Sequence, residues 1–280
     1  MVKKALLIGI NYVGTQYELN GCINDVKNMK QFLIENCNFL ESNIILLTDE
    51  TMDNLPTKEN IQNKIGWLVS NNINGDILVF HYSGHGSNIR DINNDETDKT
   101  DETIVPLDFD QIIDDWLFIN MISKIRKNVN LYCFFDSCHS GTVIDLKYNY
   151  NSNCRPKVLK QNLNNSYDMT QWTDSYIYSI ERSKEVIGNI YMLSGCKDNE
   201  TSADAIINNK NQGAFTFCLL QTFKNNCSVL PNGSNRFKNQ TLKFRNILKE
   251  INCRLDLETF DQNTQFSSSN KQNFETTINL

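Results

Sequence analysis

The chain has 280 residues, of which 40% are hydrophobic and 21% are charged, and it carries a net charge of −6 at neutral pH. This length and apolar content suffice for one large core or two smaller domains. The acidic balance, with no basic tract, argues against nucleic-acid binding, and no apolar run in the sequence is long enough to span a bilayer. Nine scattered cysteines without CxxC spacing are typical of reduced thiols, so we expect a cytoplasmic protein rather than a disulfide framework.

Strands and helices are predicted to alternate along the chain. An apolar run over 3–10 predicts a buried strand, and apolar residues at helical spacing predict a helix from Asn24 or Asp25 to about Asn36. Further strands are expected over 43–47, from Asp76 toward His85, over 131–135 and over 190–194, with an extended edge piece over 104–109. Further helices are expected over 57–70, 114–126, the later part of 213–223 and 242–256. This alternation predicts an α/β fold with a mainly parallel sheet covered on both faces by helices.

Two segments lack clear periodicity. Residues 148–187 are polar and predict a long variable loop, and the tail over 260–280 is polar as well. Because the other elements alternate without a linker or an internal repeat, we expect one domain over 1–280.

Two predicted strands end in residues suited to nucleophilic catalysis. The apolar run over 131–135 stops at Asp136, and Cys138 follows in a group of small and polar residues, whereas the strand after Asp76 runs into the Gly-flanked His85. Carboxyl ends of parallel strands meet at one sheet edge, where ligands bind. The separation, 138 minus 85, is 53 residues, close to the spacing of roughly 50 in caspase-type enzymes. A nearby imidazole can take the proton of a thiol, so the pair predicts a cysteine nucleophile with its base.

Other interpretations of these residues stay open at this point. His81 lies within its strand and is expected to pack in the sheet, and His139 should point away from the side to which Cys138 points. A metal site built from these histidines, His85 and Cys138 would fit no zinc spacing well. The cysteines at three further positions could simply be small core residues. These are Cys22, Cys133 and Cys196.

The chain resembles type I metacaspases of the caspase-like clan over nearly its whole length. The blocks that carry the resemblance are HYSGHG (81–86), DSCHSG (136–141), ALLIGINY (5–12), LNGCIND (19–25), ETIVPLDF (102–109), SGCKDNETSADA (194–205) and QFSSS (265–269). The resemblance implies a caspase-like fold with a sheet of six to eight strands. The Pro/Gln-rich extension that precedes the domain in many type I members has no counterpart here, so no N-terminal prodomain is expected.

The resemblance also implies roles for individual residues. Cys138 matches the nucleophile and His85 the base, and the backbone N–H groups of Cys138 and Gly86 are plausible donors to an oxyanion. The family cleaves after Arg or Lys, which requires an acidic pocket for the substrate. The residues at the matching pocket positions are Asp25, Asp136, Cys22 and Ser83. Asp25 alone could otherwise be a helix cap.

Type I metacaspases bind calcium through four carboxylates, so the resemblance implies Ca²⁺ as a cofactor. The residues at matching positions are Asp98, Asp114, Asp115 and Asp145. The acidic loop around Asp98 could shift the register to Asp95 or Asp101, and such a loop is usually only a solvated surface. The two consecutive acids could also merely favour a helix N-terminus by their charge.

The sequence therefore predicts a calcium-activated cysteine endopeptidase that cleaves protein or peptide substrates after Arg or Lys. Self-cleavage in the 148–187 loop, at Arg155, Lys157 or Lys160, is a further hypothesis. We expect a monomer with no nucleic-acid or membrane partner. The alternatives are a non-proteolytic binding or scaffold protein on the same fold, and a paracaspase or legumain-like peptidase.

Overall fold

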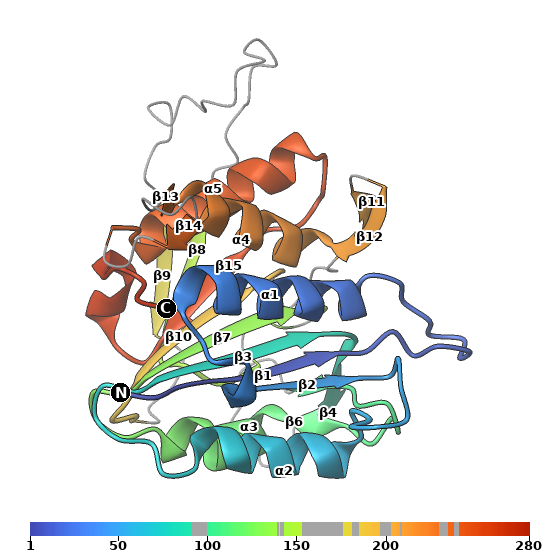
Figure 1. The fold of residues 1–280 in the computed structure, drawn as a ribbon. Coiled ribbons are helices and arrows are strands. Elements are labelled where there is room, and N and C mark those ends of the chain that lie inside the picture. Colours follow the sequence, from blue (N-terminus) through green and yellow to red (C-terminus); the bar gives the residue numbers. More distant parts are fainter. Residues whose placement is uncertain are drawn as a thin grey trace.

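The centre of the structure is an eight-stranded sheet (Figure 1). The computed structural model describes residues 1–90, 100–138, 140, 143–152, 176–180, 185–196, 203–207, 209–229, 235–237 and 241–280. The strands, in their order across the sheet, are β2 (Ile44–Thr48), β1 (Lys3–Gly9), β3 (Ile77–Ser83), β7 (Asn130–Asp136), β10 (Asn189–Ser194), β15 (Gln265–Ser268), β8 (Tyr148–Ser152) and β9 (Tyr176–Ile180). The first five are parallel and the last three join by antiparallel pairing. The mainly parallel α/β sheet predicted from the sequence is confirmed.

Helices cover both faces of the sheet (Figure 1). One face carries α1 (Cys22–Cys37), α4 (Ala214–Asn225) and α5 (Phe244–Leu257), and the other carries α2 (Lys58–Val69) and α3 (Asp114–Asn120). Each face has its own apolar cluster, one centred on aromatic residues such as Phe215 and Phe244, the other on aliphatic residues such as Ile61 and Leu117. None of the described helices combines the length and the apolar character that a bilayer crossing needs.

In the described part of the chain, three small sheets lie outside the central one. They are β4 (Gly86–Arg90), β5 (Thr100–Ile104) and β6 (Ile112–Ile113); β11 (Asp204–Ile207) and β12 (Lys210–Gly213); and β13 (Cys227–Val229) and β14 (Asn235–Phe237). The β4–β5–β6 sheet begins immediately after His85, and the β11–β12 hairpin leads directly into α4. Both therefore continue from the edge of the sheet where the candidate catalytic residues lie.

The predicted elements differ from the observed ones mainly where polar residues form strands. β8 and β9 lie within the polar segment over 148–187, and β15 lies in the polar tail. Phe266 is the one large apolar residue of β15, yet all four of its residues are buried between β10 and β8. Strands that pair on both sides satisfy their backbone groups, so they are buried without the apolar run that announces a strand in the sequence.

The helix predicted over 114–126 ends early, at Asn120. Its continuation is a 3₁₀ turn over Ile122–Lys124. The side chain of Asn72 donates to the Lys124 carbonyl at 3.1 Å and accepts the Arg126 N–H at 3.0 Å. These bonds satisfy two backbone groups that a continued α-helix would pair internally, which lowers the cost of ending the helix early.

The close packing of α1 on β1 requires a glycine at position 9. A Cβ atom there would lie 2.4 Å from the Cys22 carbonyl oxygen and 2.6 Å from a methyl carbon of Val26, whereas a Cβ atom at Gly66 in α2 would meet nothing within 4 Å. We expect Gly9→Ala to lower the free energy of unfolding by about 1–3 kcal/mol through overpacking. Gly66→Ala should raise it by about 0.5–1 kcal/mol, because alanine is the better helix former. Urea unfolding followed by circular dichroism measures both, and equal effects of the two substitutions would contradict the packing argument.

Candidate active site

The tips of β3 and β7 place the two candidate catalytic residues on neighbouring strands. The strands are parallel, with Ser83 paired to Asp136, and the Gly84 N–H donates to the Asp136 carbonyl at 3.3 Å just beyond them. The backbone at Gly86 is pressed against that of Cys138, since a Cβ atom there would lie 1.9 Å from the carbonyl oxygen of Cys138. Glycine is therefore required at this position, and the chain on both sides of it runs alongside the Cys138 turn.

Two buried tyrosines fix the backbone at His85. The Tyr12 hydroxyl accepts the His85 N–H at 2.9 Å and donates to the Val105 carbonyl at 2.6 Å. The Tyr82 hydroxyl donates to the His85 carbonyl at 2.7 Å and accepts the Val105 N–H at 3.2 Å. Burial raises the pKa of both tyrosines, so their hydroxyls keep the proton that each one donates. His85 is thus held by a bridge that the sequence analysis did not anticipate, although both tyrosines stand in the blocks it quoted.

The imidazole of His85 is oriented by the main chain of the loop after β1. Its Nε2 atom lies 2.8 Å from the carbonyl oxygen of Tyr17. A carbonyl oxygen can only accept, so Nε2 carries the proton, and in the neutral ring the Nδ1 atom keeps its lone pair. This is the tautomer that a base needs in order to take a proton from a thiol.

Cys138 follows β7 in a turn and is partly exposed, unlike the other thiols near it. The Ser140 hydroxyl closes this turn by donating to the Ser137 carbonyl at 2.8 Å, and the buried thiol of Cys196 donates to the same carbonyl at 3.1 Å. Burial raises the pKa of Cys196 to about 12 and also raises that of Cys133, so these thiols stay protonated and packed. Cys133 and Cys196 are therefore small residues of the core, which was the simplest interpretation of their positions. His139 and Gly141 lie outside the described residues.

Asp25 is a buried carboxylate of α1 rather than a helix cap. The N-cap position of α1 is Gly21, and Asp25 is 1% exposed in the first turn. Its oxygens accept the Ser83 hydroxyl at 2.8 Å and the Gly213 N–H at 3.0 and 3.1 Å. Burial, followed by the nearby charge of Asp136, raises its pKa well above the ordinary value. Cys22 lies in the same place, bonded to Ser83, and burial raises the pKa of its thiol too.

Asp136 completes this group from the tip of β7. One of its oxygens accepts the N–H of Thr216, near the start of α4, at 2.8 Å. A Cβ atom on Gly213 would lie 2.2 Å from that oxygen and 2.7 Å from an oxygen of Asp25, so the two carboxylates close on either side of the glycine. The four pocket residues predicted from the sequence therefore lie together, around a glycine that the prediction did not include.

Thr216 and Gly213 are separated from Asp136 by about eighty residues, and only the fold brings them to it. The signal in the sequence was a glycine immediately before a helix, which is a common N-cap position. On its other side the Thr216 hydroxyl bonds to Nε2 of His81 at 3.2 Å. His81 is fully buried, and burial lowers its pKa to about 3, so it is a neutral packed residue of the sheet, as expected.

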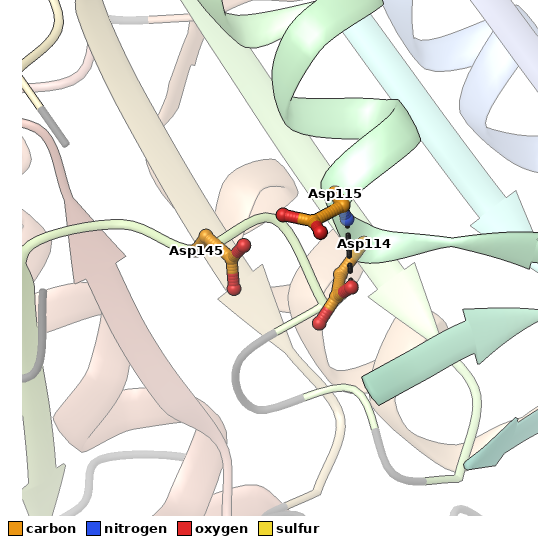
Figure 2. A group of neighbouring side chains, drawn as sticks. All are labelled: Asp114, Asp115 and Asp145. Atoms are coloured by element: carbon orange, nitrogen blue, oxygen red, sulfur yellow. Dashed lines mark hydrogen bonds between the residues drawn. The ribbon is translucent and has the colours of Figure 1, made fainter. Parts of the chain in front are cut away.

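A separate group of carboxylates lies at the start of α3 (Figure 2). Asp114, Asp115 and Asp145 each offer an oxygen within 4.8 Å of the others, and in Figure 2 the loop that carries Asp145 faces the helix start. Burial raises the pKa of Asp114 to about 7, and the charge of Asp101 contributes to this shift. Among the described residues this is the group of acids, histidines or cysteines that could hold a metal ion. Asp95 and Asp98 lie outside the described residues.

The donor set of this group fits calcium. All three side chains are carboxylates, and hard cations of this kind take oxygen ligands. Asp145 adopts a left-handed backbone conformation with φ 53° between the buried residues Ile144 and Leu146, so the loop is anchored while its acid is directed toward α3. The three aspartates come from two segments distant in sequence, as the absence of EF-hand spacing requires.

A parallel sheet with a cysteine and a histidine at adjacent strand tips is the architecture of caspase-like peptidases, and solved structures support this class. A crystal structure of a protein from Geobacter sulfurreducens aligns with a TM-score of 0.63 and 27% identity, covering 98% of this chain and 97% of that one. The structure of pro-sf-caspase-1 aligns with a TM-score of 0.51 and 11% identity over 96% of this chain and 87% of its own, which supports the fold alone.

Sequence comparison identifies the family. The family model described as metacaspase, peptidase C14 domain, matches residues 3–147. Metacaspase-1 of Meyerozyma guilliermondii is 34% identical over 96% of this chain and 70% of its own length, and Metacaspase-1 of Arabidopsis thaliana is 38% identical over 83% and 62%. The chain therefore belongs to the metacaspases, a family of cysteine peptidases, and spans roughly 60–70% of the length of these relatives.

Alkylation of thiols tests whether His85 activates Cys138. At pH 7.5, iodoacetamide should modify Cys138 at least about 10-fold faster than Cys227, because the thiolate is the reactive form and Cys227, also partly exposed, lies away from the imidazole. His85→Ala should bring the two rates together, and the buried Cys196 and Cys133 should react last. Peptide mass mapping over time gives each rate. Equal labelling of Cys138 and Cys227 in the unmodified chain would show that the histidine does not activate the thiol.

Proposed function

We propose that this chain is a cysteine endopeptidase that cleaves after Arg or Lys and that Ca²⁺ activates. The observation that carries the proposal is the pair of buried carboxylates, Asp25 and Asp136, that close around Gly213 beside the strand tips of Cys138 and His85. The residues proposed as nucleophile, base and cation site would then act together along one sheet edge.

In the proposed reaction, Nδ1 of His85 takes the proton of the Cys138 thiol, and the thiolate sulfur attacks the carbonyl carbon of the scissile bond. The carbonyl oxygen becomes an oxyanion, for which the N–H groups of Gly86 and Cys138 are the candidate donors. When the C–N bond breaks, the imidazolium returns the proton to the leaving amine. Water then hydrolyses the thioester, with His85 again as the base, and the thiol is regenerated.

The preference for a basic residue follows from the chemistry of the two acids. Asp25 is bonded to the neutral donors Ser83 and Gly213, and its raised pKa means that burial of its charge is not fully compensated. A substrate guanidinium or ammonium would supply the missing positive charge in a site shielded from water. An uncharged side chain of the same size would leave the carboxylates uncompensated, so the pocket discriminates by charge more than by shape.

The direct test is hydrolysis of two peptides that differ only in Arg or its neutral isostere citrulline before the scissile bond. With calcium, the chain should cleave the Arg peptide, and Cys138→Ala should abolish turnover. Asp25→Asn should reduce the ratio of kcat/KM for Arg over citrulline by at least about 30-fold, because removing one partner of a buried charge pair costs about 2–5 kcal/mol. Asp110→Asn, which alters an exposed acid paired with Lys58, is the matched control.

Two results would contradict the proposal in different ways. No turnover of either peptide by the folded chain would favour the binding or scaffold alternative. Equal turnover of the Arg and citrulline peptides would keep the peptidase but remove the acidic pocket from its specificity. Self-processing at Arg155, Lys157 or Lys160, the monomeric state and the cytoplasmic location stay predictions.

Calcium activation is proposed from the acidic group at α3. Asp114, Asp115 and Asp145 would hold the ion, whose positive charge would offset the repulsion between their carboxylates. The first turn of α3, which begins at Asp114, is bonded to β5, because a carboxylate oxygen of Asp114 accepts the Glu102 N–H at 3.2 Å. These residues would therefore fasten the loop after the nucleophile to the small sheet after the base, without touching the substrate.

Replacing one of the three proposed calcium ligands tests whether these aspartates hold the ion. We expect Asp145→Asn to raise the calcium concentration for half-maximal activity by at least about 10-fold, because it replaces a charged ligand by a neutral one. Calcium should also raise the thermal unfolding midpoint of the unmodified chain, and this shift should be smaller in the variant. The control is again Asp110→Asn. An unaltered midpoint shift in Asp145→Asn would place the ion elsewhere.

A further inference from the structure

The ring of the candidate base, His85, forms a closed cluster with three other aromatic rings. His85 lies 4.7 Å from Tyr12 and 6.2 Å from Tyr17, and Phe109 lies 5.8 Å from Tyr12 and 5.6 Å from Tyr17, all measured between ring centroids. Each ring therefore contacts two others, with His85 and Phe109 at opposite corners. Tyr12 is buried, whereas Tyr17 and Phe109 are 52% and 42% exposed. The cluster thus presents two aromatic side chains to solvent beside the imidazole.

The turn that carries Phe109 is fixed in place. The Phe109 N–H donates to the Pro106 carbonyl at 2.9 Å, and the Leu107 N–H donates to the Pro56 carbonyl at 3.0 Å. The carboxylate of Asp108 accepts the Lys58 N–H at the start of α2. Phe109 itself has a φ of 59°, a left-handed conformation that is costly for an aromatic residue and is held here by its neighbours. The exposed ring is therefore presented on a rigid support rather than on a free loop.

The chemistry of the proposed dyad determines which part of the substrate lies over Tyr17 and Phe109. The side chain of the residue before the scissile bond enters the pocket of Asp25 and Asp136, as proposed above. The base must deliver a proton to the leaving nitrogen, so the residue that follows the scissile bond has to lie against His85. Tyr17 and Phe109 are the exposed apolar side chains of the ring cluster there, and exposed aromatic faces beside a reactive centre favour an apolar ligand.

We propose that Tyr17 and Phe109 form the subsite for the substrate residue that follows the scissile bond, and that this subsite selects aromatic or large aliphatic side chains. The inference rests on the proposed peptidase function and adds a second specificity determinant to it. The acidic pocket selects a charged side chain before the cleaved bond, and the aromatic pair selects an apolar side chain after it.

The test uses internally quenched peptides with Arg before the scissile bond and either Phe or Gly after it, with calcium present. The unmodified chain should cleave the Phe peptide with a kcat/KM about 2- to 12-fold higher than the Gly peptide, the range expected for an aromatic pair. Phe109→Asn should bring this ratio close to one, since asparagine accepts the left-handed backbone but has no ring. Phe109→Tyr, which keeps an aromatic ring, should retain the preference for the Phe peptide. Leu40→Asn, which removes an exposed apolar side chain far from the cluster in sequence, is the control and should keep the ratio.

The ratio separates the inference from the other roles these residues could have. If the rings only position His85, Phe109→Asn will lower both rates and leave the ratio unchanged, which overturns the inference. Equal cleavage of both peptides by the unmodified chain overturns it as well, with the proposed function intact. Failure to cleave any Arg peptide overturns the proposed function and the inference together. A thermal unfolding midpoint for each variant verifies that a changed ratio comes from folded protein.

Discussion

The parallel pairing of β3 with β7 is the constraint on which the site depends. It sets Ser83 beside Asp136, so that the residues after each strand emerge together at one edge. Only glycine fits at position 86, where the chain after His85 lies against the Cys138 carbonyl. Backbone geometry therefore places Cys138 and His85 at neighbouring strand tips, and the proposed dyad then needs only the correct protonation of their side chains. The tyrosine bridge to Val105 and the carbonyl of Tyr17 provide that by fixing the position and tautomer of His85.

Backbone N–H groups at the start of α4 partly offset the cost of burying the charges of Asp25 and Asp136. Burial makes ionised carboxylates costly there, but the N–H groups of Gly213 and Thr216 point at them from a helix N-terminus, where negative charge is favoured. These donors hold the acids in position without neutralising them, and the raised pKa of Asp25 reflects the remaining cost. A bound cation would offset this cost, which is the role that the proposed specificity gives to a substrate Arg or Lys.

The sequence was sufficient for those parts of the site that depend on short, strongly patterned segments. The apolar strands before His85 and Cys138 end abruptly, and the parallel arrangement follows from the alternation of elements. It was insufficient where a contact joins distant segments through the backbone, as in the Gly213 and Thr216 bonds to the two acids. It was also insufficient for β8, β9 and β15, which join the sheet by strand pairing in segments that carry no clear apolar pattern. The candidate catalytic residues could thus be recognised in the sequence, whereas the backbone contacts that hold them in place could not.

The topology suggests why an ion remote from the substrate could govern such a site. The β4–β5–β6 sheet begins at Gly86, next to the base, and passes through Ile104 and Ile112 to Asp114 at the start of α3. Asp145 lies seven residues after Cys138 and approaches the same acids from the other side. A cation held there would join the segment that follows the nucleophile to the sheet that follows the base. Without it, the repulsion between carboxylates would act on those same two segments, so the geometry of the dyad would be coupled to calcium through the chain itself.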